Sequence, residues 1–180
     1  VKCSKALEDM IKKYKGEPVM WKTGHSLIKN KMAESDCKLG GEMSGHIFFA
    51  DDYFGYDDAI YVAARLIQML SKTDKTLSEL KSVIPIYHST PEIRLEAESD
   101  EEKFKIAKLA VEYFTENHNC NTIDGVRIQY ENGWGLVRAS NTQPVIVCRF
   151  EGDTPERMNE IKNIVLDKLQ EFGTLNISVH

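Results

Sequence analysis

The chain has 180 residues and a formal net charge of -5 at pH 7, with 42% hydrophobic and 28% charged residues. This length and composition are typical of one large or two small globular domains with hydrophobic cores. The acidic balance and the lack of a basic run argue against nonspecific binding to nucleic acid or to an anionic membrane surface. We therefore expect neither nucleic acid nor membrane as a partner, and an anionic ligand would be held by a few local side chains.

The cysteines are scattered and form no Cys-x-x-Cys pair. Reduced thiols in a cytoplasmic protein are therefore expected, rather than a disulfide framework or a zinc site. The sequence has no secretory signal and no apolar stretch of membrane-spanning length. It begins at Val1 without a methionine and passes directly into helical periodicity, so we interpret it as a piece of a longer protein. The four cysteines are Cys3, Cys37, Cys120 and Cys148.

The chain opens with a helix, a short strand and a second helix. Ser4 is the predicted cap of the first helix, and Pro18 to Trp21 is predicted to form a short buried strand. The polar loop from Lys22 to Ser26 follows, and Ser26 is predicted to cap a helix from Leu27 to Glu34. In open α/β sheets, ligands gather beyond the carboxyl ends of the strands, so this loop is a candidate site. The alternative is a plain connection.

A longer helix is expected after a strand from Ile47 to Ala50. Asp57 is the predicted cap of this helix, which would run from Asp58 to Leu70. Its apolar residues recur at helical spacing, so we expect them to face the core. Thr76 and Glu79 have the spacing of a capping box before a short helix that stops ahead of Pro85. The expected core-facing residues are Ile60, Ala63, Ala64, Ile67 and Leu70.

A domain boundary is predicted between Pro85 and Pro91, where two prolines flank small polar residues. We assign residues 1–88 to an α/β domain, a mixed sheet with flanking helices. Residues 89–180 are assigned to an α+β domain. Its predicted order is strand, helix, three strands and helix, with caps at Ser99 and Thr154. Short hairpins make this sheet antiparallel, with both helices on one face.

The stretch from Gly40 to Phe49 places polar side chains beside an apolar strand. Its glycines allow positive φ and close approach to a ligand. On an extended backbone, Glu42, Ser44 and His46 would point to one side and offer a carboxylate, a hydroxyl and an imidazole. Such a set suits a polyhydroxylated ligand, because a carboxylate accepts hydrogen bonds from two neighbouring hydroxyls. The alternative is a glycine-rich turn before a buried strand.

A second polar loop lies between two apolar strands, from Arg138 to Pro144. A guanidinium bonds two phosphate oxygens at once, and hydroxyls, amides and loop N–H groups can donate to a third. These residue types favour a phosphate site. The alternative is a hairpin loop whose Ser, Asn and Thr side chains bond their own backbone.

Taken together, three of these loops resemble the α-D-phosphohexomutases, most closely the phosphomannomutase/phosphoglucomutase group. The resemblance covers essentially the whole chain and corresponds to the third and fourth domains of a four-domain enzyme. It implies that Glu42 and Ser44 contact sugar hydroxyls and that His46 lies near the reacting groups. Thr23-Gly24-His25 and Lys2 match cleft-lining motifs, with His25 and Lys2 as further catalytic candidates and Gly24 as a binding residue. Arg138, Ser140, Asn141 and Thr142 match the family's phosphate-binding loop.

The family's phosphoserine loop, Thr-Ala-Ser-His-Asn-Pro, and its metal loop, Asp-Gly-Asp-Gly-Asp-Arg, are absent from this sequence. The resemblance therefore implies a C-terminal fragment that is inactive alone and holds no metal, with Mg²⁺ in the full-length enzyme. Its partners would be a hexose phosphate and the missing N-terminal domains. The expected activity interconverts hexose 1-phosphate and 6-phosphate through a bisphosphate, and Met43 favours glucose and mannose over glucosamine. The alternatives are a stand-alone sugar-phosphate binding or regulatory module and a phosphoglucosamine mutase fragment.

Overall fold

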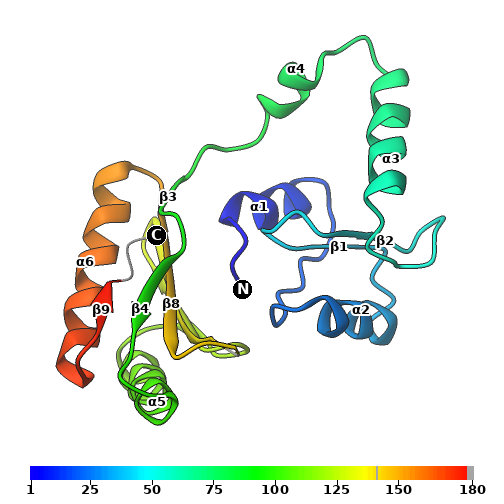
Figure 1. The fold of residues 1–180 in the computed structure, drawn as a ribbon. Helices are drawn as coiled ribbons and strands as arrows, with labels where there is room; N and C mark the ends of the chain where they lie inside the picture. Colours follow the sequence, from blue (N-terminus) through cyan, green and yellow to red (C-terminus); the bar gives the residue numbers. More distant parts are fainter. Residues whose placement is uncertain (141, 178–180) are drawn as a thin grey trace. The chain divides into compact units, whose positions relative to one another are not determined.

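The computed structural model describes residues 1–140 and 142–177, and of Ile177 only the backbone. The chain divides into two compact units (Figure 1). The first unit spans Lys2–Pro85, and the second contains the residues from Ile86 onward together with Val1. The predicted combination of sheets and helices in two domains is confirmed. None of the described helices has the length and apolar character needed to cross a membrane.

The first unit consists of four helices and one small hairpin, in the order two helices, two strands and two helices. Ser4 caps the first helix as predicted, because its Oγ accepts a hydrogen bond from the Ala6 N–H. The capping box of Thr76 and Glu79 is also confirmed. The elements are α1 (Lys5–Lys13), α2 (His25–Glu34), β1 (Leu39–Gly41), β2 (Ile47–Phe49), α3 (Ala59–Ser71) and α4 (Leu77–Lys81).

The predicted strand from Pro18 to Trp21 is wrong, because this segment takes no strand structure. A strand exists only when a neighbour completes its ladder of backbone hydrogen bonds. The described sheet of this unit consists of β1 and β2 alone, paired antiparallel in the register Leu39↔Phe49 to Gly41↔Ile47. The apolar pattern of residues 18–21 was therefore insufficient to form a strand.

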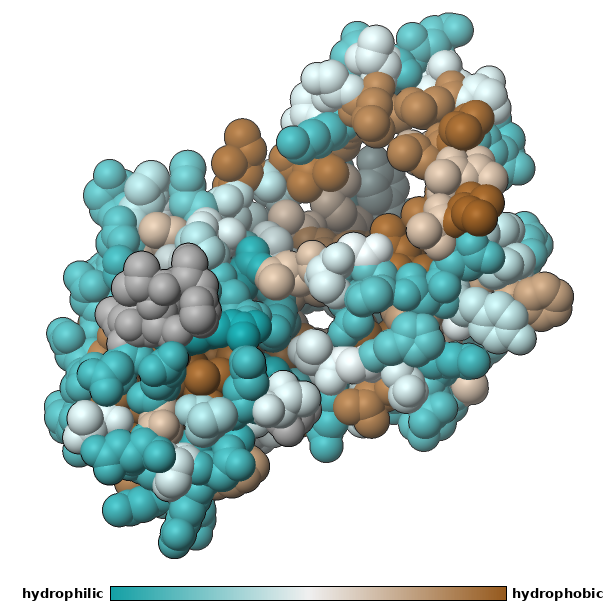
Figure 2. All heavy atoms as spheres, in the orientation of Figure 1, coloured by the Kyte–Doolittle hydropathy of each residue, from teal (hydrophilic) through white to brown (hydrophobic). Residues whose placement is uncertain are grey.

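The predicted core-facing stripe of α3 is also wrong. Ile60 is 84% exposed and Ile67 is 67% exposed. A different side of α3 contacts the hairpin: Tyr61 meets Phe49 edge to face at 5.8 Å, and the Arg65 guanidinium lies 4.6 Å from the same ring. Helical periodicity identified residues that share a face but not the face that finds a partner. Figure 2 shows hydrophobic side chains at the surface over this part of the unit.

In its described residues, the second unit is an antiparallel sheet of seven strands with two long helices. The strand order is β5-β6-β7-β8-β4-β9, and β3 pairs with β8 beside this path. Ser99 and Thr154 cap the two helices as predicted, and Pro155 follows Thr154 at the first helical position. The elements are β3 (His88–Ser89), β4 (Ile93–Glu96), α5 (Asp100–Asn117), β5 (Cys120–Asn121), β6 (Val126–Tyr130), β7 (Gly133–Ala139), β8 (Val145–Gly152), α6 (Pro155–Phe172) and β9 (Asn176–Ile177).

Both helices cover the same face of this sheet (Figure 1). Alternate residues of the strands, such as Ile128, Val137 and Phe150, pack with Ile106 and Val165 of the helices in one buried cluster. Because strand side chains alternate between faces, the residues between them lie on the opposite side. That helix-free face includes Arg127 of β6, Arg138 of β7 and Arg149 of β8.

Candidate functional site

The polar stretch after β1 forms the turn of the β1–β2 hairpin rather than an extended strand. The Glu42 N–H donates to the His46 carbonyl at 2.9 Å, and the Gly45 N–H donates to the Glu42 carbonyl at 3.0 Å. The alternation expected for Glu42, Ser44 and His46 is therefore wrong, because the chain reverses direction between them. Ser44 is exposed within this turn.

The glycines of this hairpin have different roles. Gly45 has φ 93°, a conformation that disfavours other residues, whereas Gly40 and Gly41 do not have positive φ. A Cβ on Gly40 would lie 2.5 Å from the Met32 Sδ, so a side chain there would clash with α2. Gly40 therefore lets β1 approach α2, and Gly45 serves the turn.

Glu42 joins the hairpin turn to the start of α2. The Gly24 N–H donates to Glu42 Oε1 at 2.9 Å, across 18 positions of sequence. Gly24, and not Ser26 as predicted, precedes the first turn of α2, so the helix begins at His25. Gly24 has φ 140°, which a residue with a side chain rarely adopts. A carboxylate at this helix end is also favoured by the positive end of the helix dipole. The bond uses one carboxylate oxygen, and the second oxygen can accept hydrogen bonds from a ligand.

His46 lies at the end of the same turn, beside two other polar or aromatic side chains. Its Nδ1 is 2.5 Å from Asp57 Oδ2. The ring of His25 is 6.4 Å from the His46 ring and 5.2 Å from that of Phe48. The predicted Thr-Gly-His loop and hairpin turn are thus brought together through Gly24–Glu42 and His25–His46. Phe48, which is fully buried, is the apolar residue against which the His25 ring packs.

The predicted cap of α3 is wrong by one residue. Asp58 caps the helix, because its Oδ1 accepts hydrogen bonds from the Ile60 and Tyr61 N–H groups. The Tyr53 hydroxyl donates to Asp58 Oδ2 at 2.6 Å, and this bond lowers the pKa of Asp58. Asp57 therefore pairs with His46 instead, a role that the sequence analysis missed. The only signal of this role in the sequence is the presence of two adjacent aspartates, because one aspartate is enough to cap the helix and the other is left for another contact.

Lys2 belongs to the same unit, where it precedes the cap of α1 and is half-buried. Its predicted role in catalysis stays a prediction.

The second polar loop joins β7 to β8, as predicted. Arg138 is on β7 itself, opposite Val147, and its side chain is 8% exposed. Its Nε lies 3.2 Å from Asp124 Oδ1. This pair holds the guanidinium through Nε and orients the two terminal nitrogens, which are the ones that form a fork with phosphate oxygens. Phosphate binding by Arg138 therefore remains a prediction that the geometry permits.

The hydroxyl of Ser140 bonds the backbone of its own loop, since it accepts from the Thr142 N–H at 3.3 Å. This contact matches the plain-turn alternative, and Ser140 is buried whereas Thr142 is exposed. Asn141, also predicted to bind phosphate, lies outside the described residues.

Two basic residues that the sequence analysis missed hold the end of this loop. The Lys103 ammonium, 3% exposed, donates to the Gln143 carbonyl at 3.0 Å and to Asp100 Oδ1 at 2.6 Å. Arg94 Nη1 donates to Gln143 Oε1 at 2.8 Å. Gln143 is therefore bound through both its backbone and its side chain.

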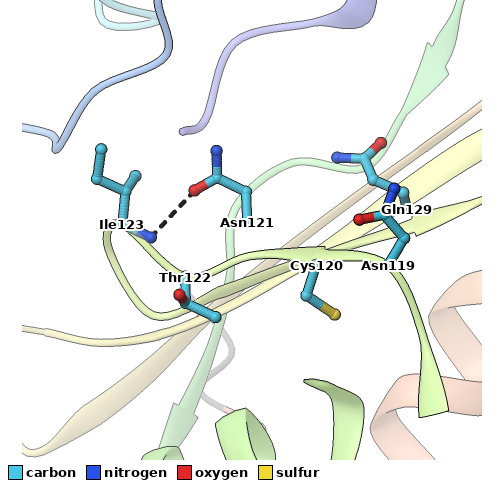
Figure 3. A pocket seen from close by; sticks show the side chains of 6 residues that line it. All are labelled: Asn119, Cys120, Asn121, Thr122, Ile123 and Gln129. Atoms are coloured by element: carbon cyan, nitrogen blue, oxygen red, sulfur yellow. Dashed lines mark hydrogen bonds between the residues drawn. The ribbon is translucent and has the colours of Figure 1, made fainter. Parts of the chain in front are cut away.

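The second unit also has a shallow hollow, beside β5 (Figure 3). Asn121 Oδ1 accepts from the Ile123 N–H within it at 3.0 Å, a contact internal to the turn. Its lining is neutral, so it offers no charge to an anionic ligand. The lining residues are Asn119, Cys120, Asn121, Thr122, Ile123 and Gln129.

Metal-binding side chains do not gather in the described part of the chain. Among residues 1–140 and 142–177, no group of three His, Cys, Asp or Glu could hold a metal ion. These residues therefore do not fit the magnesium ion that the resemblance implies for the full-length enzyme.

Comparisons with known proteins point to one family. Residues 1–87 match the family model "Phosphoglucomutase/phosphomannomutase, alpha/beta/alpha domain III", and residues 92–168 match the C-terminal domain model of the same family. A phosphomannomutase/phosphoglucomutase from Pseudomonas aeruginosa is 48% identical over 94% of the chain and 37% of its own length. A phosphoglucomutase from Neisseria meningitidis is 42% identical over 91% of the chain and 36% of its own length.

A solved structure agrees with these sequence matches. A phosphoglucomutase/phosphomannomutase family protein from Burkholderia thailandensis has a TM-score of 0.84 and 37% sequence identity. The match covers 97% of this chain and 37% of that protein. The chain thus spans little more than a third of the length of the relatives that it matches.

Proposed function

Since this chain belongs to the phosphoglucomutase/phosphomannomutase family, we propose that it supplies the substrate-recognition loops of a phosphohexomutase. The complete enzyme would move phosphate between the 1 and 6 positions of glucose or mannose through a bisphosphate intermediate. One observation supports this assignment more than any other. The Gly24–Glu42 hydrogen bond and the His25–His46 contact bring two separate loops into one polar cluster.

Glu42 is the residue that we assign to sugar recognition. One of its oxygens is held by the Gly24 N–H, so the carboxylate has a fixed position before substrate arrives. The other oxygen can accept from a ring hydroxyl, and a charge-assisted bond of this kind is about twice as strong as a neutral one. Ser44, exposed in the same turn, can donate to or accept from a neighbouring hydroxyl.

His46 is the residue that we assign to proton transfer. A sugar hydroxyl that attacks a phosphoryl group loses a proton, and an imidazole nearby can accept it. His46 is 49% exposed at its side chain, so a ligand in the turn can reach it. His25 lies against His46 and is a second donor or proton relay, with Lys2 as a third candidate.

The β7–β8 loop is the part that we assign to the phosphate that is not transferred. Arg138 would donate through its terminal nitrogens, and Ser140, Asn141 and Thr142 would complete the contacts. The buried ammonium of Lys103, paired with Asp100, holds the end of this loop through the Gln143 carbonyl. Phosphoryl transfer itself depends mainly on positioning and charge neutralisation. We propose that the phosphoserine and Mg²⁺ belong to a part of the complete enzyme outside this chain.

The assignment is tested by comparing the chain with the longer protein that contains it. We expect the longer protein to convert glucose 1-phosphate and mannose 1-phosphate to the 6-phosphates in a coupled assay. The purified 180-residue chain should show no conversion at any magnesium concentration. If the chain alone is active, or the longer protein converts neither sugar, the proposed function is wrong. Preference for glucosamine phosphate would instead favour the phosphoglucosamine mutase alternative.

A further inference from the structure

We propose that Asp57 is a positioning residue, which fixes the tautomer and the orientation of His46. This inference rests on the proposed function, because the tautomer has a catalytic consequence only if His46 accepts the substrate proton. The structure gives three independent observations for it: the contact between the two side chains, the backbone pairing of Asp57, and the separate use of Asp58.

The contact places a carboxylate against one particular ring nitrogen. Asp57 Oδ2 lies 2.5 Å from His46 Nδ1, and the side chain of Asp57 is 22% exposed against 49% for His46. A carboxylate only accepts, so Nδ1 must be the nitrogen that bears the proton. In the neutral ring, the lone pair is then on Nε2, which is the atom able to take a proton from a substrate hydroxyl.

The backbone fixes Asp57 at this place. Asp57, which lies outside the named strands, pairs with Phe48 of β2 in an isolated antiparallel bridge. Paired residues of neighbouring strands have side chains on the same face, and His46 precedes Phe48 by two positions. His25 contacts the rings of both His46 and Phe48, which agrees with this arrangement. Because Phe48 is fully buried, the position of Asp57 is tied to the small core of the unit.

The neighbouring aspartate performs the structural task, which separates the two roles. Asp58 accepts from two backbone N–H groups at the start of α3 and from the Tyr53 hydroxyl. Asp57 is therefore not needed to cap α3. A carboxylate held against a histidine in this way sets the tautomer in proteolytic triads, where replacement by the amide lowers turnover by favouring the wrong tautomer.

The first test measures the tautomer directly in the 180-residue chain, labelled with ¹⁵N at histidine. Long-range ¹H–¹⁵N spectra distinguish a protonated ring nitrogen from one with a lone pair. In mildly alkaline buffer, we expect neutral His46 to bear its proton on Nδ1, against the preference of histidine in water for Nε2. Asp57→Asn should move the proton to Nε2. The control is Asp58→Asn, the same chemical change one residue away, where asparagine caps as well as aspartate.

The second test is kinetic and uses the longer protein. Asp57→Asn should lower kcat by about ten-fold or more, since roughly ten- to a hundred-fold is lost when a group that orients a metal-ligating histidine is removed and more is lost in proteolytic triads. KM should stay nearly constant, because binding through Glu42 and Arg138 is unchanged. Asp58→Asn should leave both parameters close to those of the parent.

The outcomes separate this inference from the proposed function. If His46 of the parent chain is protonated on Nε2, the inference is overturned, even if Asp57→Asn fails to fold. It is also overturned if Asp57→Asn keeps the parent tautomer and the parent kcat. The proposed function is tested by the activity of the parent enzyme, which the tautomer measurement in the chain does not require.

Discussion

The two units differ in the size of the hydrophobic core that supports their polar loops. In the first unit, the hydrophobic side chains buried between Lys2 and Pro85 are Met32 and Phe48. In the second, residues of the central strands and of both helices form a continuous buried cluster. The loop around Glu42 is therefore positioned mainly by hydrogen bonds and ring contacts. The loop around Ser140 is positioned by the ends of the central strands β7 and β8 and by a buried ammonium.

Because of this difference, some of the residues that stabilise the fold of the first unit are also candidate site residues, whereas the core residues of the second unit are not. The contacts Gly24–Glu42 and His46–Asp57, which connect the loops of the first unit, are made by candidate site residues, so a substitution there affects geometry and function together. In the second unit, the core side chains and the candidate phosphate loop are distinct, and the core can be perturbed without touching the loop. Substitutions in the core of the second unit should therefore lower stability alone, whereas substitutions at the polar contacts of the first unit should change activity.

The largest effect is expected in the core of the second unit. Leu169 of α6 is fully buried, so Leu169→Ala should lower the free energy of unfolding by about 2–5 kcal/mol. Ile67→Ala, at the exposed stripe of α3, should change the free energy of unfolding by less than about 0.5 kcal/mol. Urea unfolding would measure both, with Trp134 as the reporter of Leu169→Ala in a Trp21→Phe background and Trp21 as the reporter of Ile67→Ala in a Trp134→Phe background. Equal shifts of the two midpoints, each relative to its own background, would contradict the comparison.

Glu42→Gln is the corresponding test of the first unit. The amide oxygen can still accept from the Gly24 N–H, so the fold should be retained. Loss of the charge should weaken the bonds to sugar hydroxyls by about 1.5–3 kcal/mol, which corresponds to a roughly ten-fold or larger fall in turnover of the longer protein. The matched control is Glu17→Gln, at an exposed position of the same unit. Identical steady-state kinetics for Glu42→Gln and the parent would remove Glu42 from the site.

Arg138→Lys tests the loop of the second unit. A lysine ammonium cannot bond Asp124 and also form a fork with a phosphate, so affinity for glucose 6-phosphate should fall roughly ten-fold or more. Calorimetric titration of the longer protein at fixed salt would measure it. Arg157→Lys, on α6 beside Glu160, is the control and should bind as the parent does. If Arg138→Lys also binds as the parent does, the loop is only a turn.

The sequence predicted those features that depend on neighbouring residues. Ser4, Ser99 and Thr154 were identified as helix caps because a cap bonds an N–H two or three positions away. The hairpin from β6 to β7 and the antiparallel sheet followed from short turns in the same way. The loop from Arg138 to Pro144 was also predicted as a loop, since polar residues interrupt apolar strands there. The stretch from Glu42 to His46 was expected to be extended and is a turn instead.

The features that were wrong depend on partners elsewhere in the chain. The segment of residues 18–21 had the pattern of a strand but no strand beside it, and the apolar stripe of α3 had no covering surface among the described residues. The choice between Asp57 and Asp58 as cap was decided by the Phe48–Asp57 bridge, which no local pattern contains. Likewise, Arg138 was predicted without Asp124, a partner 14 positions away.

The smallest expected effect concerns how the folding stability of each unit depends on pH. In the first unit, hydrogen bonding from Arg65 lowers the pKa of Asp51, and that from Tyr53 lowers the pKa of Asp58. A carboxyl whose pKa is lower in the folded state stabilises the fold above its unfolded pKa, and this contribution is lost as pH falls through the folded value. The first unit should therefore weaken in acid.

The second unit should weaken in alkali, and Tyr130→Phe tests this. Burial raises the pKa of Tyr130 to about 12, and burial also raises the pKa of Cys148. Because the unfolded tyrosine ionises near pH 10, the contribution of Tyr130 is complete below about pH 10 and is lost as pH rises toward 12.

Near neutral pH, Tyr130→Phe should be neutral or stabilising by up to about 1 kcal/mol, because the buried hydroxyl has no hydrogen-bond partner among the described residues. Between about pH 10 and 12, the variant should lose less stability than the parent, because only the parent contains the buried Tyr130 hydroxyl. The change due to Cys148 is the same in both proteins. Urea midpoints followed by Trp134 fluorescence across this range would measure the difference. Parallel curves for parent and variant would show that Tyr130 ionises equally easily in the folded and unfolded states, so that its burial is not what limits the second unit in alkali.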